Sequence, residues 1–202
     1  MRGALLLGIA ALAASIGIPV ILLDIPGSDD PKSPDRSGPA RKGLEKALKA
    51  RPAAFLDTDR AALVTTGNTA DHLDLLARCD WIVEAIIEKP QPKQELFAKI
   101  ERIAPHAIVT SNTSGIPMSV LLQDRSSRFR ERFCGTHYFN PVRYMHLLEI
   151  IPTPHTAPEV LEAVRTIHER LLGKGIVIAQ HDLLDEAGRL VFSCLTRSVF
   201  AR

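Results

Sequence analysis

Short apolar runs rich in β-branched residues alternate along this chain with segments whose apolar residues recur at helical spacing. The runs cover residues 20–24, 81–88, 107–110, 133–136, 147–151 and 176–179, and they are typical of buried parallel strands. Helical spacing marks residues 70–78, 94–103 and 158–172, and a further helix is expected to begin at Ser37 or Pro39. This order of elements predicts an α/β fold with a doubly wound, mostly parallel sheet.

The N-terminal 23 residues leave two interpretations open. Residues 3–23 form a run without charge that is long enough for a membrane span. The start of the chain also imitates a signal peptide, since Arg2 is followed by an apolar run and by small residues at 11–14. Against this, Gly17 and Pro19 interrupt the run, and a strand pattern then ends in Asp24. Helix, turn and strand with a terminal acid are the second half of a βαβ dinucleotide-binding unit whose first strand is missing. We favour this interpretation and expect no membrane partner; a membrane-anchored or exported binding protein is the alternative.

Composition narrows the function classes. The 202 residues are 46% hydrophobic and 24% charged, as in an ordinary globular protein with room for one large or two small domains. The net charge of +2 gives no sign of a nucleic-acid partner. Cys79, Cys134 and Cys194 are odd in number and far apart, which argues against a disulfide framework and a zinc site. We therefore expect no bound metal and a reducing, cytoplasmic setting.

Three polar clusters stand at or near the ends of predicted strands. They are Ser-Asn-Thr-Ser-Gly at 111–115, His-Tyr-Phe-Asn-Pro at 137–141, and Glu149 in the run at 147–151. In an open α/β sheet, ligands bind beyond the carboxyl ends of the strands, so these groups are expected to converge there. A histidine with a carboxylate twelve positions later has the composition of a general base and the residue that orients it.

The Ser-Asn-Thr-Ser and His-(aromatic)-Phe-Asn-Pro strings, with the glutamate that follows, resemble the NAD-binding domain of the 3-hydroxyacyl-CoA dehydrogenases of bacterial fatty-acid β-oxidation. The resemblance covers about residues 3–182 and implies a Rossmann-like fold that binds NAD. The resemblance implies a first strand and an all-helical second domain that this sequence does not show, so we expect a domain truncated at both ends relative to the family. We expect one NAD-binding domain over residues 1–182 and a divergent C-terminal helix over residues 183–202.

The resemblance also implies catalytic roles. His137 matches the histidine that accepts the hydroxyl proton, Glu149 the acid that fixes its tautomer, and Ser114 the serine that hydrogen-bonds the substrate oxygen. We expect His137 and Glu149 within hydrogen-bond reach, with Ser114 in the same cleft. The structural alternatives are a strand-end histidine bonded to backbone and a serine that caps a helix starting near Pro117. The remaining histidines are expected at the surface or at helix ends: His72, His106, His146, His155, His168 and His181.

Six positions are implied as NAD contacts by the same resemblance. They are Gly3, Asp24, Glu88, Lys93, Ser114 and Asn140. Gly3 keeps the middle glycine of the family's Gly-x-Gly-x-x-Gly turn, whose other two glycines are absent here. Asp24 follows Gly3 at the distance expected of an acid that binds a ribose 2′-hydroxyl, although such an isolated acid is commonly a solvated turn residue. Glu88 and Lys93 match residues beside the nicotinamide ribose, and Asn140 an asparagine near the nicotinamide.

The predicted helix that begins near residue 37 is strongly basic. It carries Lys42, Lys46 and Lys49, in a region that the family turns toward the coenzyme A moiety, whose phosphates require cations. We expect at least one of these lysines to bind substrate. A solvated helix face is the simpler interpretation.

These residues favour an oxidoreductase that converts (3S)-3-hydroxyacyl-CoA to 3-oxoacyl-CoA with NAD. The alternative is a catalytically impaired remnant that keeps the fold and acts as a nucleotide-binding or interaction module, because the glycine turn is incomplete and the family's active-site Asn after residue 182 is absent. Apolar residues between 183 and 195 recur at helical spacing, so the C-terminal helix is expected to mediate self-association.

Overall fold

The computed structural model describes residues 2–179. Its elements, in chain order, are α1 (Arg2–Ser15), β1 (Val20–Asp24), α2 (Gly38–Leu48), the 3-10 helix η1 (Thr58–Leu63), β2 (Val64–Asn68), the 3-10 helix η2 (Leu73–Arg78), β3 (Trp81–Glu84), α3 (Pro90–Ile103), β4 (Ile108–Ser111), α4 (Met118–Leu121), α5 (Ser127–Glu131), β5 (Phe133–Tyr138), β6 (Leu147–Pro152), α6 (Pro158–Thr166), the π-helix η3 (Ile167–Leu171) and β7 (Gly175–Ile178). The helix predicted over residues 183–202 lies outside the described residues.

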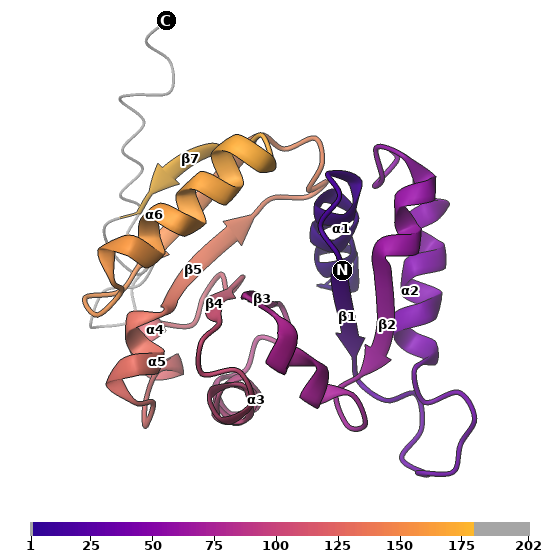
Figure 1. The fold of residues 1–202 in the computed structure, drawn as a ribbon, viewed down its shortest axis with the longest axis horizontal. Coiled ribbons are helices and arrows are strands. Elements are labelled where there is room, and N and C mark those ends of the chain that lie inside the picture. The colour runs from indigo at the N-terminus through magenta and orange to yellow at the C-terminus, as the bar shows by residue number, and fades with distance from the viewer. Residues whose placement is uncertain (1, 180–202) are drawn as a thin grey trace, which may run out of the picture.

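The strands of residues 2–179 form two sheets. Strands β1 and β2 pair in parallel, and a five-stranded sheet has the order β3-β4-β5-β6-β7 (Figure 1). Every pair in the larger sheet is parallel except β5 with β6, which is antiparallel. The predicted doubly wound, mostly parallel α/β fold is confirmed. Within the described residues, β1 and β3 each have one strand neighbour, so no first strand joins the two sheets.

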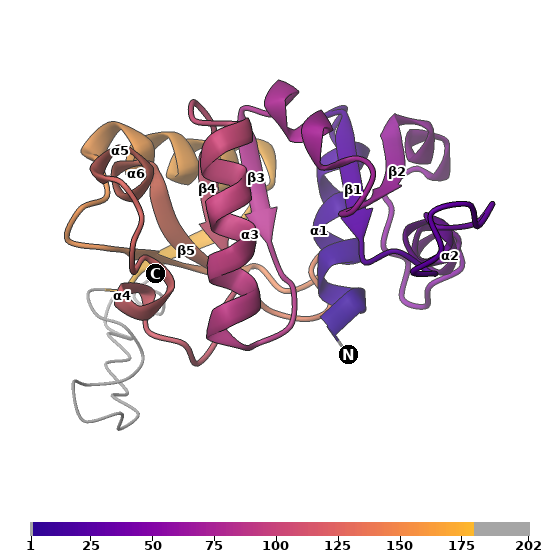
Figure 2. The same cartoon turned by 90° about the horizontal axis from the view of Figure 1, so that it is seen from below.

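Hydrophobic clusters show how the helices cover the sheets. Phe133 and Cys134 are adjacent in β5 and point to opposite faces, as strand geometry requires. Phe133 packs against Phe97 of α3, on the face that α3, α4 and α5 cover. Cys134 belongs to the cluster of α1 and α6, which includes Leu12 and Val164. Helices on both faces are the arrangement of a doubly wound sheet (Figure 2).

Helix α1 packs against both sheets, which explains its uncharged sequence. Ile9 and Leu12 contact the cluster under β5 and β6, while Ala10, Ala11 and Ala14 pack with β1, β2 and α2. A helix that is apolar all round is expected when two of its sides are buried. Among the described residues, no helix is long and apolar enough to cross a membrane.

Several predicted boundaries were wrong in detail. The strand predicted over residues 81–88 ends at Glu84, so Glu88 lies beyond the strand. The helix predicted over residues 94–103 begins earlier, at Pro90, because proline fits the first helical position, where no backbone N–H is required. The helix predicted over residues 70–78 is a 3-10 helix that starts at Leu73.

The burial of His168 was not predicted. It was expected at the surface or at a helix end, and it does lie in η3 directly after α6, but its side chain is fully buried and Nε2 lies 2.6 Å from the Tyr138 hydroxyl oxygen. Its Nδ1 lies 2.6 Å from the Val164 carbonyl oxygen, and the edge of its ring meets Trp81. Since a carbonyl only accepts, Nδ1 donates to Val164 and Nε2 accepts from Tyr138. His168 is thus a satisfied core residue.

Candidate active site

His137 and Glu149 face each other across the antiparallel β5–β6 pair. They are directly opposite in the register, and Nδ1 of His137 lies 2.9 Å from Oε2 of Glu149. Directly opposite residues on one face of an antiparallel pair have neighbouring side chains, so the strand register itself creates this contact. The expected proximity is present, but its cause differs from the one predicted: Glu149 lies inside β6, not beyond a parallel strand end.

Both side chains are partly accessible, with 18% of His137 and 28% of Glu149 exposed. Phe139 packs edge-on against the imidazole at a centroid separation of 4.7 Å and restricts its rotation. Within the described residues, Nε2 of His137 has no hydrogen-bond partner. A carboxylate on Nδ1 holds the proton there and leaves the Nε2 lone pair free to accept a proton, as in hydrolase triads.

The Ser-Asn-Thr-Ser segment is tied down at almost every position. Ser111 ends β4 and donates its hydroxyl to Glu84, and Asn112 accepts from the backbone N–H of Tyr138 at 2.8 Å. Thr113 donates to Glu88. Ser114 is exposed, and its own backbone N–H is bonded, so its hydroxyl is the group of this segment that faces solvent. Ser114 does not cap a helix, since α4 begins after Pro117.

Glu88 is the acceptor that shapes the turn around Ser114. Its Oε1 accepts from the Thr113 hydroxyl and from the N–H groups of Ser114 and Gly115, at 2.8 Å and 3.2 Å for the two amides. Partial burial acts to raise the pKa of Glu88, but these hydrogen bonds and the charge of Lys93 outweigh it and lower the pKa. The Glu88 carboxylate is therefore ionised at neutral pH.

Lys93 lies behind Glu88 in the protein interior. Its ammonium is 2.6 Å from Oε1 of Glu84 and 3.4 Å from Oε2 of Glu88. The side chain is buried, and its contact with the partly exposed Glu88 links it to the surface.

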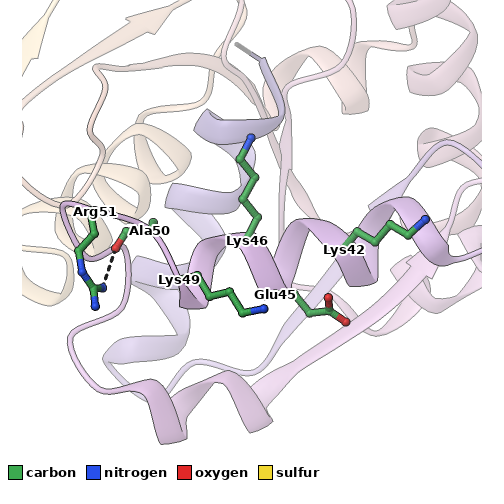
Figure 3. Close-up of a pocket in the computed structure, with 6 residues that line it drawn as sticks. All are labelled: Lys42, Glu45, Lys46, Lys49, Ala50 and Arg51. Carbon is green, nitrogen blue, oxygen red and sulfur yellow. Dashed lines mark hydrogen bonds between the residues drawn. The ribbon is translucent and has the colours of Figure 1, made fainter.

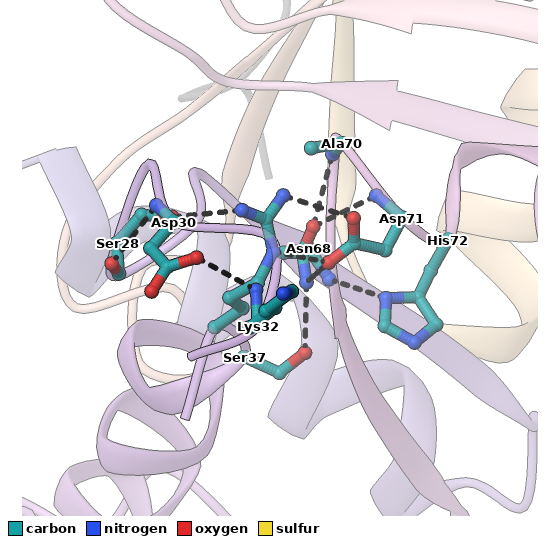
Figure 4. A network of polar contacts seen from close by, with 9 residues as sticks. Ser28, Asp30, Lys32, Ser37, Asn68, Ala70, Asp71 and His72 are labelled. Carbon is teal, nitrogen blue, oxygen red and sulfur yellow. Dashed lines mark hydrogen bonds and ion pairs between the residues drawn. The ribbon is translucent and has the colours of Figure 1, made fainter. Parts of the chain in front are cut away.

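At the carboxyl end of β1, Asp24 is exposed and accepts from the N–H of Ile25. The adjoining loop is held by a polar network centred on the buried Asn68 (Figure 4). The amide of Asn68 donates to Ser37 and Asp71, and Asp71 forms a two-point ion pair with Arg36. Figure 2 shows the N-terminus of α1, where Gly3 lies, on the same side as the end of β1. A helix N-terminus beside a strand-end acid fits a dinucleotide.

Figure 3 shows a basic groove along α2. The groove has a volume of about 550 Å³, and its lining residues are Lys42, Glu45, Lys46, Lys49, Ala50 and Arg51. Four cations against one carboxylate provide an electropositive surface for a phosphorylated ligand. The three lysines singled out from the sequence therefore line one groove; Lys42 and Lys46 lie in α2, and Lys49 follows its last residue.

Asn140 is exposed and lies near the start of the loop between β5 and β6. The loop is anchored from two directions: Lys174 donates its ammonium to the carbonyls of Val142 and Met145, and Arg143 donates to the carbonyls of Ala53 and Phe55. Burial lowers the pKa of Lys174. These contacts fix the loop that carries Asn140, which follows His137 by three residues.

Sequence reasoning placed the 111–115 string at the site but missed Glu84. Glu84 is buried, and it accepts from the Ser111 hydroxyl and from Lys93. A signal was available, since an acid that interrupts an apolar strand requires a buried partner.

Comparisons with known proteins agree with this geometry. The sequence matches the family "3-hydroxyacyl-CoA dehydrogenase, NAD binding domain" over residues 2–183. A protein of Deinococcus radiodurans named "Probable 3-hydroxyacyl-CoA dehydrogenase" is 51% identical over 172 residues, which cover 85% of this chain and 49% of the relative. The chain thus spans about half the length of that relative.

Solved structures extend the agreement to the fold. The (S)-3-hydroxybutyryl-CoA dehydrogenase of Ralstonia eutropha has a TM-score of 0.70 at 28% identity, over 89% of this chain and 61% of the other. The dehydrogenase part of a multifunctional enzyme of C. elegans has a TM-score of 0.68 at 25% identity, over 88% and 39% of the two chains. The chain therefore belongs to the family of 3-hydroxyacyl-CoA dehydrogenase NAD-binding domains.

Proposed function

We propose that this chain provides the NAD-binding and proton-transfer half of an enzyme that oxidises (3S)-3-hydroxyacyl-CoA to 3-oxoacyl-CoA in fatty-acid β-oxidation. The observation that carries the proposal is the His137–Glu149 pair, with 2.9 Å between Nδ1 and Oε2. An imidazole whose Nδ1 proton is held by a carboxylate is a general base at neutral pH. Its Nε2 accepts the hydroxyl proton of the substrate and returns it in the reverse reaction.

Ser114 is proposed to donate its exposed hydroxyl to the substrate oxygen, next to the base. The Glu88 carboxylate sets the position of this serine through the Ser114 and Gly115 amides. Bound NAD supplies the hydride acceptor, and the protein's contribution is orientation and electrostatics.

The proposed NAD contacts are Gly3, Asp24, Glu88, Lys93, Ser114 and Asn140. Support comes from the N-terminus of α1 beside the end of β1, which suits a pyrophosphate and a ribose, and from the ionised Glu88 near Ser114. For the substrate, the groove formed by Lys42, Lys46 and Lys49 suits the phosphates of coenzyme A.

Replacement of the orienting acid tests the catalytic proposal. Glu149→Gln keeps the side-chain shape but no longer stabilises a protonated His137, so kcat should fall by about 10²–10⁴, as for other acid–base groups. The assay follows NADH absorbance with 3-oxoacyl-CoA, and Glu159→Gln, an exposed acid at the start of α6, is the control. Equal kcat for Glu149→Gln and the unmodified chain would show that the His137–Glu149 contact does not contribute to catalysis.

A second candidate function is a catalytically impaired remnant that binds nucleotide or a partner. In a dinucleotide-binding fold, the phosphate-binding turn leads from a strand of the sheet into the helix that follows it. Among the described residues, no strand lies between β1–β2 and β3–β7 to carry such a turn, and this separation favours the second candidate. NAD binding in calorimetry without turnover of 3-hydroxyacyl-CoA would support this candidate.

We also propose a cytoplasmic location and self-association. The first is supported by the odd number of widely spaced cysteines, and the second by the apolar spacing in residues 183–195, which lie outside the described residues. Sedimentation with and without residues 183–202 tests the association; a monomer in both cases would refute it.

A further inference from the structure

A buried ion pair lies directly behind the turn that carries Ser114. Lys93 has 0% and Glu84 2% of its surface exposed, and their charged atoms are 2.6 Å apart. Lys93 also occupies the apolar face of α3, since Phe97 and Ile100 follow it at helical spacing and are buried. Buried ion pairs seldom stabilise a fold more than well-packed apolar residues do. A charged pair at a core position therefore points to a role other than packing.

Glu84 connects the ends of two neighbouring strands. It is the last residue of β3, and its Oε2 accepts from the hydroxyl of Ser111 at the end of β4, at 2.5 Å. Its Oε1 accepts from the N–H of Ile86 at 2.6 Å as well as from Lys93. These contacts hold the segment that leaves β3 and leads to Glu88.

Lys93 extends the connection to the site surface. Its ammonium lies 3.4 Å from Oε2 of Glu88, and the other oxygen of Glu88 accepts from Thr113, Ser114 and Gly115. The chain of contacts runs from Glu84 through Lys93 and Glu88 to the backbone of Ser114. Glu84 and Lys93 are buried, and Glu88 is the first partly exposed side chain along these contacts.

We propose that Glu84 and Lys93 are positioning residues, which orient the Glu88 carboxylate so that it holds the 113–115 turn and places the Ser114 hydroxyl. The inference rests on the proposed function for its effect on catalysis, but its structural part is independent of any activity. In this role Lys93 acts on the turn through Glu88.

The decisive variant removes both charges together. Glu84→Gln with Lys93→Met leaves no unpaired buried charge and keeps side-chain volume, so the fold should survive. Amide hydrogen exchange at Ser114 and Gly115, measured by NMR, should become at least about tenfold faster, the loss expected for a charge-assisted hydrogen bond. Lys99→Met, on the exposed side of α3, is the matched control and should leave both exchange rates unchanged.

Activity supplies the second measurement. The double variant should lose kcat by about tenfold or more while its melting temperature stays near that of the unmodified chain, a combination that a purely structural role does not produce. Glu88→Gln, in a partly exposed residue, tests the same link without changing the core and should also accelerate exchange.

The outcomes separate the two proposals. If the double variant folds and amide exchange at Ser114 and Gly115 is unchanged, the positioning role is overturned. If the double variant does not fold, unchanged exchange in Glu88→Gln overturns it. Faster exchange in a chain that never oxidises 3-hydroxyacyl-CoA supports the positioning role and refutes the proposed function.

Discussion

Acid should destabilise this protein through His168. The buried ring donates from Nδ1 to Val164 and accepts at Nε2 from Tyr138, an arrangement that only a neutral imidazole satisfies. Burial lowers the pKa of His168 from 6.5 to about 4; the hydrogen bond to Val164 acts in the opposite direction, and the nearby charge of Lys174 adds to the lowering. Protonation of His168 would place a positive charge in the core near that of Lys174 and remove the acceptor for the Tyr138 hydroxyl.

The sign and size follow from proton linkage. Above pH 6.5 the ring is neutral in the folded and unfolded chain and contributes no pH dependence. As the pH falls from 6.5 to 4, the unfolded chain binds a proton that the folded chain rejects. The free energy of unfolding should then decrease by about 1.4 kcal/mol per pH unit, reaching a total near 3 kcal/mol.

Urea denaturation between pH 4 and pH 7.5 measures this contribution. His168→Gln should have a lower free energy of unfolding at pH 7.5. Between pH 6.5 and pH 4, the free energy of unfolding of this variant should fall less steeply with pH than that of the unmodified chain, by the amount that one proton contributes. His155→Gln, at an exposed histidine after β6, controls for replacing a histidine and should retain the original slope. If His168→Gln and the unmodified chain show the same slope, the ring titrates normally and the argument from burial is wrong.

Three other outcomes follow from local geometry. Gly135→Ala should lower stability by about 1–3 kcal/mol in urea denaturation, because the new Cβ would collide with Met118 and lie 3.0 Å from Cβ of Ile151, whereas Gly115→Ala, with open space, should change it by less than about 0.5 kcal/mol. Asn68→Ala should cost about 1–3 kcal/mol, since its side chain accepts from the N–H groups of Ala70 and Asp71 in the interior; a loss below 0.5 kcal/mol would mean that water replaces the amide. Asp24→Ala should weaken NAD binding in calorimetry by about ten- to a hundredfold, with Asp29→Ala as the control from the same loop; equal affinity in all three proteins would remove Asp24 from the ribose site.

The sequence by itself determined the type and order of most elements and the residues worth testing. Local periodicity identifies strands and helices because it records which side of an element is apolar, and this was enough to predict β1, β4, β5 and α6 near their observed positions. The polar strings at 111–115 and 137–141 were visible for the same local reason. The histidine, the glutamate and the serine were selected before any contact between them was known.

Only the tertiary structure decided how those residues meet. The antiparallel direction of β6 places Glu149 opposite His137, and periodicity does not encode the direction of a neighbouring strand. Likewise, Lys93 is fully buried and His168 is a core residue, because partners in other elements satisfy their polar atoms. Long-range pairing supplies those partners, so the burial of a polar side chain is a property of the assembled fold.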